Sequence, residues 1–303
     1  MRPSTCRTRR QIVAGVISYS GTTGPDLEAF VRRVHDISTI PQIALQVLKV
    51  ANDPLSGAAD LKEVMETDAA LSARILRCVN SSAYAVRTKI TNLQQAIAYL
   101  GLKQIRNIAL TASVAEMFRE DLGIEPYSRG GLWKHLVTVG ICARLIAMRR
   151  KVANFEDAFL AGLLHDIGII IIDQNAPKQF RQIIENLTPE KTLSEIEREY
   201  IGFDHCLVGE ELGKAWGFPP NVRAAISHHH GSHNYRGEEI DIVRCVEVAN
   251  LICTLKGISS VGMKLLRVPA AAFKGLQLTK SDIAVLAEDL ENEIAQNAAL
   301  YHL

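Results

Sequence analysis

The sequence has almost no excess of charge of either sign, which removes one common reason to expect a nucleic-acid partner. Lysine and arginine number 34 and aspartate and glutamate 33, so the formal net charge is +1. Proteins that bind nucleic acid or anionic membrane surfaces through electrostatics usually carry a basic excess. We therefore expect neither a nucleic-acid partner nor a membrane partner.

Long apolar runs and closely paired cysteines are also missing. No stretch approaches the roughly 18 uninterrupted apolar residues of a membrane span. No two cysteines have the two-residue separation of a zinc or dithiol motif. The six cysteines are Cys6, Cys78, Cys142, Cys206, Cys245 and Cys253. Most of them lie among apolar residues, as free buried thiols do, and this usage favours a reducing, cytoplasmic setting.

A small basic cluster precedes a short apolar segment at the start of the chain. The cluster consists of Arg2, Arg7, Arg9 and Arg10, and the segment after it is "QIVAGVI". A signal peptide needs an apolar core of roughly 7–15 residues and a small-residue cleavage site. Because this segment is shorter and runs at once into "SYSGTTG", we expect residues 1–26 to form a loose tail.

Helix-start signals recur along the remaining chain. In "TNLQQAIAYLG", Thr91 and Gln94 have the spacing of a capping box, and Thr279 and Asp282 repeat that spacing near the C-terminus. The apolar residues that follow recur every three or four positions, as they do on the buried face of a helix. Both segments are therefore predicted to be helices.

Helix-stop signals point the same way, and strand-like patterns are scarce. Thr188 followed by Pro189 predicts another helix start, while Gly217 followed by Pro219 and Pro220 predicts a sharp helix end. The two strand-like candidates, "QIVAGVISYS" and "IIIID", are short and isolated. We predict an all-α fold.

The histidines are distributed unevenly. The segment "REDLGIEPYSRGG" (119–131) interrupts the helical pattern with one proline and three glycines. Of nine histidines, only His35 precedes this segment. We therefore expect the chemistry of the protein to lie in the second half of the chain.

The second half contains one aspartate whose apolar surroundings require an explanation. Asp166 lies in "GLLHDIGIIII", and an ionised carboxylate is costly in such a setting unless it is paired or binds a metal ion. Imidazoles combined with a carboxylate favour iron, manganese, nickel or zinc. The residues that could form this site are His135, His165, Asp166, His205, His228, His229 and His230.

Taken singly, these histidines also have ordinary structural interpretations. His135 fits a satisfied helix residue, and His205 fits a first-turn residue that follows a capping Asp204. The segment "SHHHGSH" fits a polar loop with incidental affinity for nickel or zinc. Only the combination favours a metal site.

The order of these residues resembles the HD superfamily of helical metal-dependent phosphohydrolases. Further motifs narrow the match: Ile40-Pro41, the stretch from Asp68 to Leu71, Asn80-Ser81-Ser82, Ala96 through Leu100-Gly101, "LAGLLHDIG", "GFDHCLVGEELGKAWGFPPNVRAAISHHH" and "VEVANLIC". With them, roughly residues 28–255 resemble the HDOD domain, an HD-related output domain of bacterial signalling proteins. We interpret Asn80-Ser81-Ser82 as a structural motif at a helix end, where asparagine tolerates the left-handed conformation and serines can cap.

The resemblance implies a fold and a division of the chain. The fold is an all-α, multi-helix HD-like bundle preceded by an N-terminal helical subdomain. Residues 27–125 would form the N-terminal half, residues 126–257 the HD-like half with the metal site, and residues 258–303 a C-terminal helical extension.

The resemblance also implies a metal-ligand set. The matching residues are His135, His165, Asp166, His205, His229 and His230. The final aspartate of metal-binding relatives is Asn250 here, a weak neutral ligand, and the lysine expected three residues later is Cys253. A glutamate that some relatives place before the first histidine is Gly131, and no Gly-Tyr-Pro sequence follows the histidine pair. We therefore expect one divalent ion (Fe, Mn, Ni or Zn) rather than two.

Two functions remain open at this point. One is a bacterial regulatory module with a retained metal site and little or no catalysis, which acts on a signalling partner or a second copy of itself. The alternative is a metal-dependent phosphohydrolase acting on a nucleotide or cyclic dinucleotide. In that case Asp166, His165 and His205 would be the catalytic residues, and His205 or His229 would assist proton transfer.

Overall fold

The structure is a computed structural model of the 303-residue chain, and it describes residues 27–37, 41–119, 123–263 and 270–303. The all-α prediction is confirmed, since the regular elements in these ranges are helices and the only β-type pairing there is one isolated bridge between Ile124 and Tyr127. The predicted tail (1–26), the strand-like segment "QIVAGVISYS" and Ile40 lie outside the described residues.

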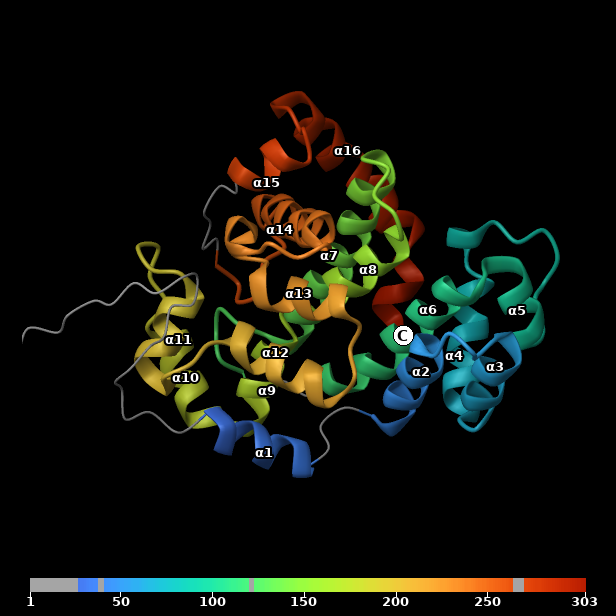
Figure 1. Cartoon of the computed structure of the whole chain (residues 1–303), viewed down its shortest axis with the longest axis horizontal. Coiled ribbons are helices and arrows are strands. Elements are labelled where there is room, and N and C mark those ends of the chain that lie inside the picture. The colour runs from blue at the N-terminus through green and yellow to red at the C-terminus, as the bar shows by residue number, and fades with distance from the viewer. Residues whose placement is uncertain (1–26, 38–40, 120–122, 264–269) are drawn as a thin grey trace, which may run out of the picture.

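The first half of the chain forms a compact group of helices around α6. The elements are α1 (Leu27–Ile37), α2 (Gln42–Asn52), α3 (Ala58–Glu66), α4 (Ala69–Val79), η1 (Ser82–Tyr84), α5 (Leu93–Leu100), α6 (Leu102–Val114) and η2 (Ala115–Phe118). Helix α6 is buried on nearly all sides and packs against α2, α4 and α5. Helix α1 lies apart from this group (Figure 1) and packs against the second half, where the rings of Phe30 and Phe203 are 5.1 Å apart.

The second half is built around three packed helices, α7, α8 and α14. Its elements are α7 (Arg129–Arg149), α8 (Phe155–Leu164), α9 (Ile167–Asn175), α10 (Pro177–Glu185), α11 (Leu193–Ile201), α12 (His205–Ala215), α13 (Pro220–His228), η3 (Ser232–Asn234), α14 (Ile240–Leu255), α15 (Ala270–Gly275), α16 (Lys280–Gln296) and η4 (Ala298–His302). Helices α12 and α13 cover α9 and α8, and α16 returns along α7 (Figure 1). The strand-like "IIIID" lies inside α9, where burial on all sides removes the helical periodicity from the sequence.

Helix α7 is apolar because it is the central helix of this half. By length and composition alone it could cross a membrane, but 72% of its most apolar window is buried inside the protein. The last segment of the chain, η4, packs against α7, and the hydroxyl of Tyr301 lies 2.9 Å from the hydroxyl of Thr138. The protein itself therefore accounts for the apolar character of α7.

The helix ends test the capping predictions. The capping box of Thr279 and Asp282 is confirmed at the start of α16. The start predicted at Thr188 and Pro189 is wrong: α11 begins at Leu193, where Thr192 and Glu195 form a capping box of their own. A reciprocal box satisfies two backbone donors, which outweighs the single fixed φ that proline supplies.

Two further predicted details change by small amounts. Helix α5 is capped by Asn92 rather than Thr91, and the side chain of Asn92 accepts a hydrogen bond from the Gln95 backbone. Asn80 ends α4 as expected, but its φ of −84° is not left-handed. Its side-chain amide instead binds both the Leu76 carbonyl and the backbone of Ile90, at 2.8 Å each, and so ties α4 to the following loop.

Candidate metal centre

The residues predicted to hold a metal ion come from separate helices and lie together in the second half. His135 is in the middle of α7, His205 is the first residue of α12, and His229 directly follows α13. His165 and Asp166 lie between α8 and α9. All five are buried, and His230, the next residue after His229, is exposed at the edge of the group.

The junction between α8 and α9 explains how adjacent residues can face the same space. His165 ends α8 with helical dihedrals, but Asp166 has φ −103° and ψ 19°, which breaks the helical path. On one continuous helix, neighbouring side chains would point about 100° apart. The break turns Asp166 toward the ring of His165, so that Oδ2 of Asp166 is 3.2 Å from Nε2 of His165.

A glycine allows His205 to reach the same space. A Cβ on Gly168 would lie 2.0 Å from the carbonyl oxygen of His205, so only glycine permits α9 and α12 to approach this closely. Gly162 acts similarly between α8 and α7, because a Cβ there would lie 2.8 Å from the Cα of Gly140. The glycine of "HDIG" is therefore part of the site's construction.

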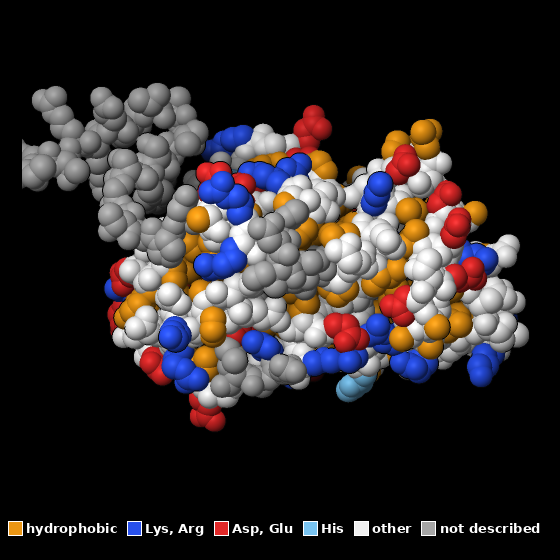
Figure 2. Space-filling model, turned by 90° about the horizontal axis from the view of Figure 1, so that it is seen from below, with side chains coloured by type: hydrophobic (Ala, Val, Ile, Leu, Met, Phe, Trp, Pro, Cys, Tyr) orange, Lys and Arg blue, Asp and Glu red, His pale blue; other side chains and the backbone are white. Residues whose placement is uncertain are grey.

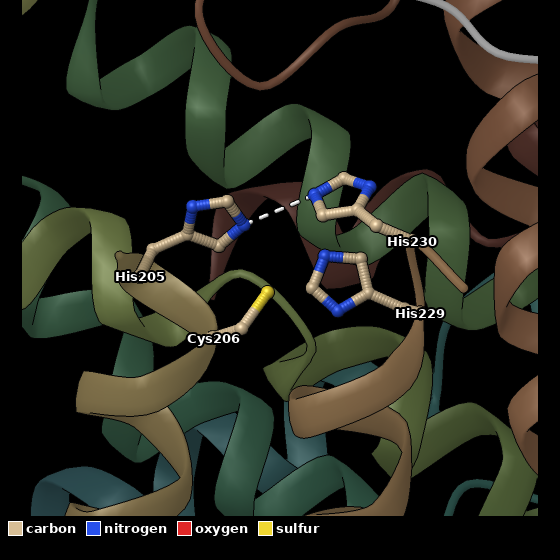
Figure 3. A group of neighbouring side chains, drawn as sticks. All are labelled: His205, Cys206, His229 and His230. Carbon is tan, nitrogen blue, oxygen red and sulfur yellow. Dashed lines mark hydrogen bonds between the residues drawn. The ribbon is translucent and has the colours of Figure 1, made fainter. Parts of the chain in front are cut away.

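The Asp166 carboxylate is the centre of the cluster, with histidine nitrogens next to both oxygens. Nε2 of His165 and Nε2 of His135 lie 3.2 and 3.7 Å from Oδ2. Nε2 of His229 and Nε2 of His205 lie 3.0 and 3.4 Å from Oδ1. His230 extends the second group, since its Nε2 is 3.1 Å from Nε2 of His205 (Figure 3).

Contacts of the opposite ring nitrogen, Nδ1, set the tautomer of three of these rings. Nδ1 of His135 is 2.9 Å from the Ile258 carbonyl, Nδ1 of His165 is 2.7 Å from that of Gly162, and Nδ1 of His229 is 2.9 Å from that of Ile226. A carbonyl only accepts, so Nδ1 must carry the hydrogen. In a neutral ring Nε2 then carries a lone pair, and the lone pairs of these three rings face Asp166.

His205 has a different partner. Its Nδ1 is 2.6 Å from the Glu197 carboxylate, and the same oxygen accepts the backbone N–H of His205 at 3.0 Å. Burial by itself lowers the pKa of His205, but the neighbouring Cys206 and Glu197 outweigh it and raise the pKa well above its ordinary value. Nδ1 of His205 therefore donates to Glu197, and Nε2 lies within hydrogen-bond distance of Nε2 of His230.

Four buried atoms at the centre have no hydrogen-bond partner: Nε2 of His135, His165 and His229, and Oδ1 of Asp166. Burial lowers the pKa of His135 to about 4, so that ring stays neutral. Lone pairs thus converge on a buried carboxylate, which is the arrangement of ligand atoms that a cation satisfies.

The spacing of the donors also fits a shared ion. Ligands about 2.1 Å from a metal, at angles between octahedral and tetrahedral, are separated by about 3.0–3.4 Å. The separations of 3.0, 3.2 and 3.4 Å around Asp166 and of 3.1 Å between His205 and His230 fall in that range, and the 3.7 Å between His135 and Oδ2 of Asp166 is longer. The residues present therefore fit a divalent transition metal.

Comparison with known families agrees with this fold and order of residues. The model of the HDOD domain matches residues 37–232, about two thirds of the chain. The chain belongs to the HDOD domain family. A solved HDOD domain protein of unknown function from Geobacter sulfurreducens is 26% identical, with a TM-score of 0.72, and the match covers 91% of this chain and 98% of that one.

Other similar proteins match at lower identity. A protein from Marinobacter aquaeolei VT8, provisionally named a signal transduction protein, is 21% identical with a TM-score of 0.72, over 90% of this chain and 63% of that one. A protein from Shewanella amazonensis SB2B, provisionally named a phosphohydrolase, is 21% identical with a TM-score of 0.69, over 93% and 99%. An uncharacterized protein of Treponema pallidum (strain Nichols) is 22% identical over 245 residues, which are 80% of this chain and 47% of that protein. This chain thus spans about half the length of that curated relative.

A cavity of about 540 Å³ adjoins the candidate metal centre of this HDOD protein. His229 and His230 form part of its wall, and the side chains of α11, α13 and α14 form much of the rest. The polar lining includes hydroxyl, imidazole and guanidinium groups, among them Thr192, Ser194, Arg198, His228 and Ser259, and three carboxylates, Glu195, Asp204 and Glu247. Arg198 is also paired with Asp204, the residue that caps α12.

The residues that depart from the metal-binding relatives are placed differently from one another. Asn250 lines this cavity, and its side-chain oxygen accepts a hydrogen bond from Thr254 at 3.3 Å. Cys253 is fully buried next to Cys142, and Gly131 is in the first turn of α7 beside the capping Ser128. His228, the third histidine of the triplet, stacks on Tyr235 with ring centroids 4.9 Å apart.

Two residues of the HDOD site were not among the sequence-based candidates. Glu197 orients His205, but it lies eight positions earlier in the chain, and that spacing alone is no recognised ligand pattern. Cys206 directly follows His205, and its Sγ lies with the ring nitrogens of His205, His229 and His230 in one group of atoms within 4.8 Å of one another. Its position beside a candidate ligand was the available signal.

Proposed function

We propose that this HDOD protein is a cytoplasmic regulatory module of bacterial signal transduction that holds one divalent transition-metal ion at Asp166 and has little or no catalytic turnover. The observation that carries the metal proposal is the set of buried, partnerless donor atoms around Asp166. Asp166 would hold the ion, with nitrogen ligands drawn from the surrounding histidines His135, His165, His205, His229 and His230. The bound ion would supply Lewis-acid chemistry and a fixed positive charge.

The charge of the site supports one ion rather than two. Asp166 is the one carboxylate whose two oxygens face these histidine nitrogens. Two divalent ions about 3.5–4 Å apart, as in two-metal sites, would leave several uncompensated positive charges in a buried cluster. At Asn250 this chain supplies a neutral amide in place of the carboxylate expected in metal-binding relatives, so the second ion has one anionic ligand fewer.

A small ligand in the cavity would provide the input, because the cavity and the proposed metal centre share residues. His229 and His230 belong to both, and Arg198 with several hydroxyl groups would suit a phosphate or nucleotide. Helix α11 carries Arg198 next to Glu197, which holds His205. A ligand that shifts α11 would therefore change the orientation of a metal ligand, and the output would pass to a signalling partner or to a second copy of the chain.

The surface available to such a partner carries charges of both signs together with apolar side chains. On the face shown in Figure 2, acidic and basic side chains lie among apolar ones. Exposed large apolar residues include Leu55, Tyr99, Met148 and Leu255. This distribution suits a protein partner better than nucleic acid, whose recognition relies on a basic stripe.

A second candidate function is a metal-dependent phosphohydrolase acting on a nucleotide or cyclic dinucleotide. The specific observation in its favour is that the cavity reaches His229 and His230 and is large enough for a small phosphorylated ligand. One structural relative is also provisionally named a phosphohydrolase. In this function Arg198 would hold the phosphate, and His205 or His229 would move a proton to the leaving oxygen.

The two functions are separated by one set of measurements on protein purified without a histidine tag. Elemental analysis gives the metal content, and a phosphodiester assay with added manganese or iron gives turnover, both for the natural protein and for Asp166→Ala. We expect about one metal ion per chain, lost in the variant, without turnover. Metal together with activity that disappears in Asp166→Ala would establish the phosphohydrolase instead, and absence of metal after reconstitution would reject both metal-based functions.

A further inference from the structure

Cys206 is placed differently from the other cysteines of the described chain. Cys78, Cys142, Cys245 and Cys253 are buried without lining the cavity beside the metal centre, whereas Cys206 lines it. Cys206 is the second residue of α12, directly after His205, whose backbone approaches Gly168 closely. Its side chain is 8% exposed.

The sulfur of Cys206 faces the same space as three imidazole rings. Figure 3 shows the rings of His205, His229 and His230 and the Cys206 sulfur turned toward one another. One ligand atom from each of the four residues lies within 4.8 Å of the others. Because zinc binds sulfur at about 2.3 Å and nitrogen at about 2.0–2.1 Å, four donors so grouped can close on one tetrahedral ion with small side-chain movements.

An independent observation is that buried polar atoms in this space have no partner. Nε2 of His229, a residue only 1% exposed, has no hydrogen-bond partner, and neither does Oδ1 of Asp166 next to it. Both atoms face the group that contains Cys206, so the sulfur is not an isolated cysteine but one member of an unsatisfied donor set.

We propose that Cys206 is a thiolate ligand of the metal ion, together with His205, His229 and His230 on the Oδ1 side of Asp166. This inference rests on the proposed metal-binding function. On binding, the Cys206 S–H bond breaks, and the hydrogen shared by Nε2 of His205 and Nε2 of His230 is also released. Both protons leave to solvent, and one sulfur–metal bond and the nitrogen–metal bonds form. The thiolate then adds a second negative charge to that of the Asp166 carboxylate beside the divalent ion, while Glu197 keeps its hydrogen bond from Nδ1 of His205.

A sulfur ligand also determines which metal the site prefers. Thiolate with imidazole favours zinc, ferrous iron or cobalt over manganese and magnesium, which prefer oxygen ligands. It further makes the ion sensitive to oxidants, because metal binding requires the thiolate form and oxidation of the sulfur removes it. The ligand group of His205, Cys206, His229 and His230 is therefore of the nitrogen–sulfur type.

Cobalt(II) provides a direct test, because a Co–thiolate bond produces a charge-transfer band in the near ultraviolet that imidazole and carboxylate ligands do not. The metal-free full-length protein is titrated with Co²⁺, alongside Cys206→Ala and a matched control, Cys245→Ala, whose buried thiol does not line the cavity. We expect the band in the natural protein and in Cys245→Ala. We expect Cys206→Ala to bind Co²⁺ without the band and more than about tenfold more weakly.

The outcomes separate this inference from the proposed function. If the natural protein binds Co²⁺ with no charge-transfer band, the thiolate ligand is rejected while metal binding at Asp166 stands. A band that persists in Cys206→Ala also rejects Cys206. If no Co²⁺ binds, the proposed metal function fails and this inference with it. The absence of the band in the natural protein rejects the inference without any variant, and the Co²⁺ affinity of Cys206→Ala shows whether that variant keeps the rest of the site.

Discussion

Nε2 of His229 lies 3.0 Å from Oδ1 of Asp166, and neither atom takes part in a hydrogen bond of good geometry. His229 already uses Nδ1 to donate to the α13 backbone, so its Nε2 presents a lone pair to a carboxylate. Two acceptors held face to face in a buried site repel each other unless a cation lies between them. The fold holds this pair together, and the energetic consequences of that arrangement can be measured.

Removing the metal ion should lower the stability of the protein. An ion that binds only the folded state adds about 2.7 kcal/mol at a free concentration of 100 Kd. For a chain of this size each kcal/mol moves Tm by about 2–4 °C, so chelation should lower Tm by roughly 5–10 °C. The measurement is thermal unfolding with and without chelator. In Asp166→Asn, which keeps the shape of the side chain but loses its charge, the Tm should no longer respond to metal.

The control for that experiment is Asp53→Asn, a change on an exposed loop remote from the cluster. Its response to chelator should equal that of the natural protein. An unchanged metal response in Asp166→Asn would show that the ion binds elsewhere.

Glu197 should act as a positioning residue for His205. Its carboxylate holds both Nδ1 and the backbone N–H of that histidine, at 2.6 and 3.0 Å. Loss of such an outer partner typically weakens metal binding by about 10–100-fold. We expect Glu197→Ala to show a loss of this size in a competition titration, and Glu197→Gln a smaller one because the amide oxygen can still accept.

A substitution of a second glutamate on the same helix controls for a purely structural effect of Glu197→Ala. Glu199 is exposed and pairs with Lys191, so Glu199→Ala should leave metal affinity unchanged. If Glu197→Ala lowers Tm equally in the presence and absence of metal while the affinity stays constant, the positioning role is wrong.

Some of these contacts could be predicted from the sequence and others could not, for a physical reason. The cap of α16 follows from a short-range spacing, and the candidate residues around Asp166 follow from their residue types and from the order that resembles the HD superfamily. The Glu197–His205 contact depends on the chain reversal at Gly202, whose φ of 85° lets α11 fold back on α12. Nothing in the local pattern of "SEIEREY" specifies which face of α11 meets His205, and the same limit applied to Cys206.

Gly168 should be required for the site because it sets the separation of α9 and α12. A methyl group there would lie 2.0 Å from the carbonyl oxygen of His205, a backbone atom that cannot swing away. Overpacking typically costs about 1–3 kcal/mol, and here it would also displace His205 from Asp166. We expect Gly168→Ala to lower both Tm and metal affinity. Gly130→Ala, where a Cβ meets nothing within 4 Å, is the matched control and should leave both unchanged.

Glu247 should give the protein a distinct pH response. Burial raises the pKa of this carboxyl above 4.5, partly offset by Ser232. A raised pKa means that the folded state binds the proton more tightly than the unfolded state does. The contribution of Glu247 to stability is therefore greatest at low pH and falls as pH rises from about 4.5 through the folded-state pKa. Glu247→Gln should remove this slope and be the more stable protein at neutral pH, as measured by denaturant unfolding across pH. Equal slopes for the two proteins would contradict the prediction.

Asn250→Asp should reveal whether the missing carboxylate limits this site. Asn250 lines the cavity that contains His229 and His230, and an aspartate there would add a second anionic oxygen ligand. We expect the metal content found by elemental analysis to rise from about one toward two ions per chain, because the added charge compensates for the second ion. Asn234→Asp places the same new charge elsewhere on the cavity wall and should leave the stoichiometry at one.

If phosphodiester hydrolysis accompanies the second ion in Asn250→Asp alone, the natural protein is an enzyme silenced at this position. If the natural protein already holds two ions, Asn250 is a sufficient ligand, and the charge argument for a single ion is wrong.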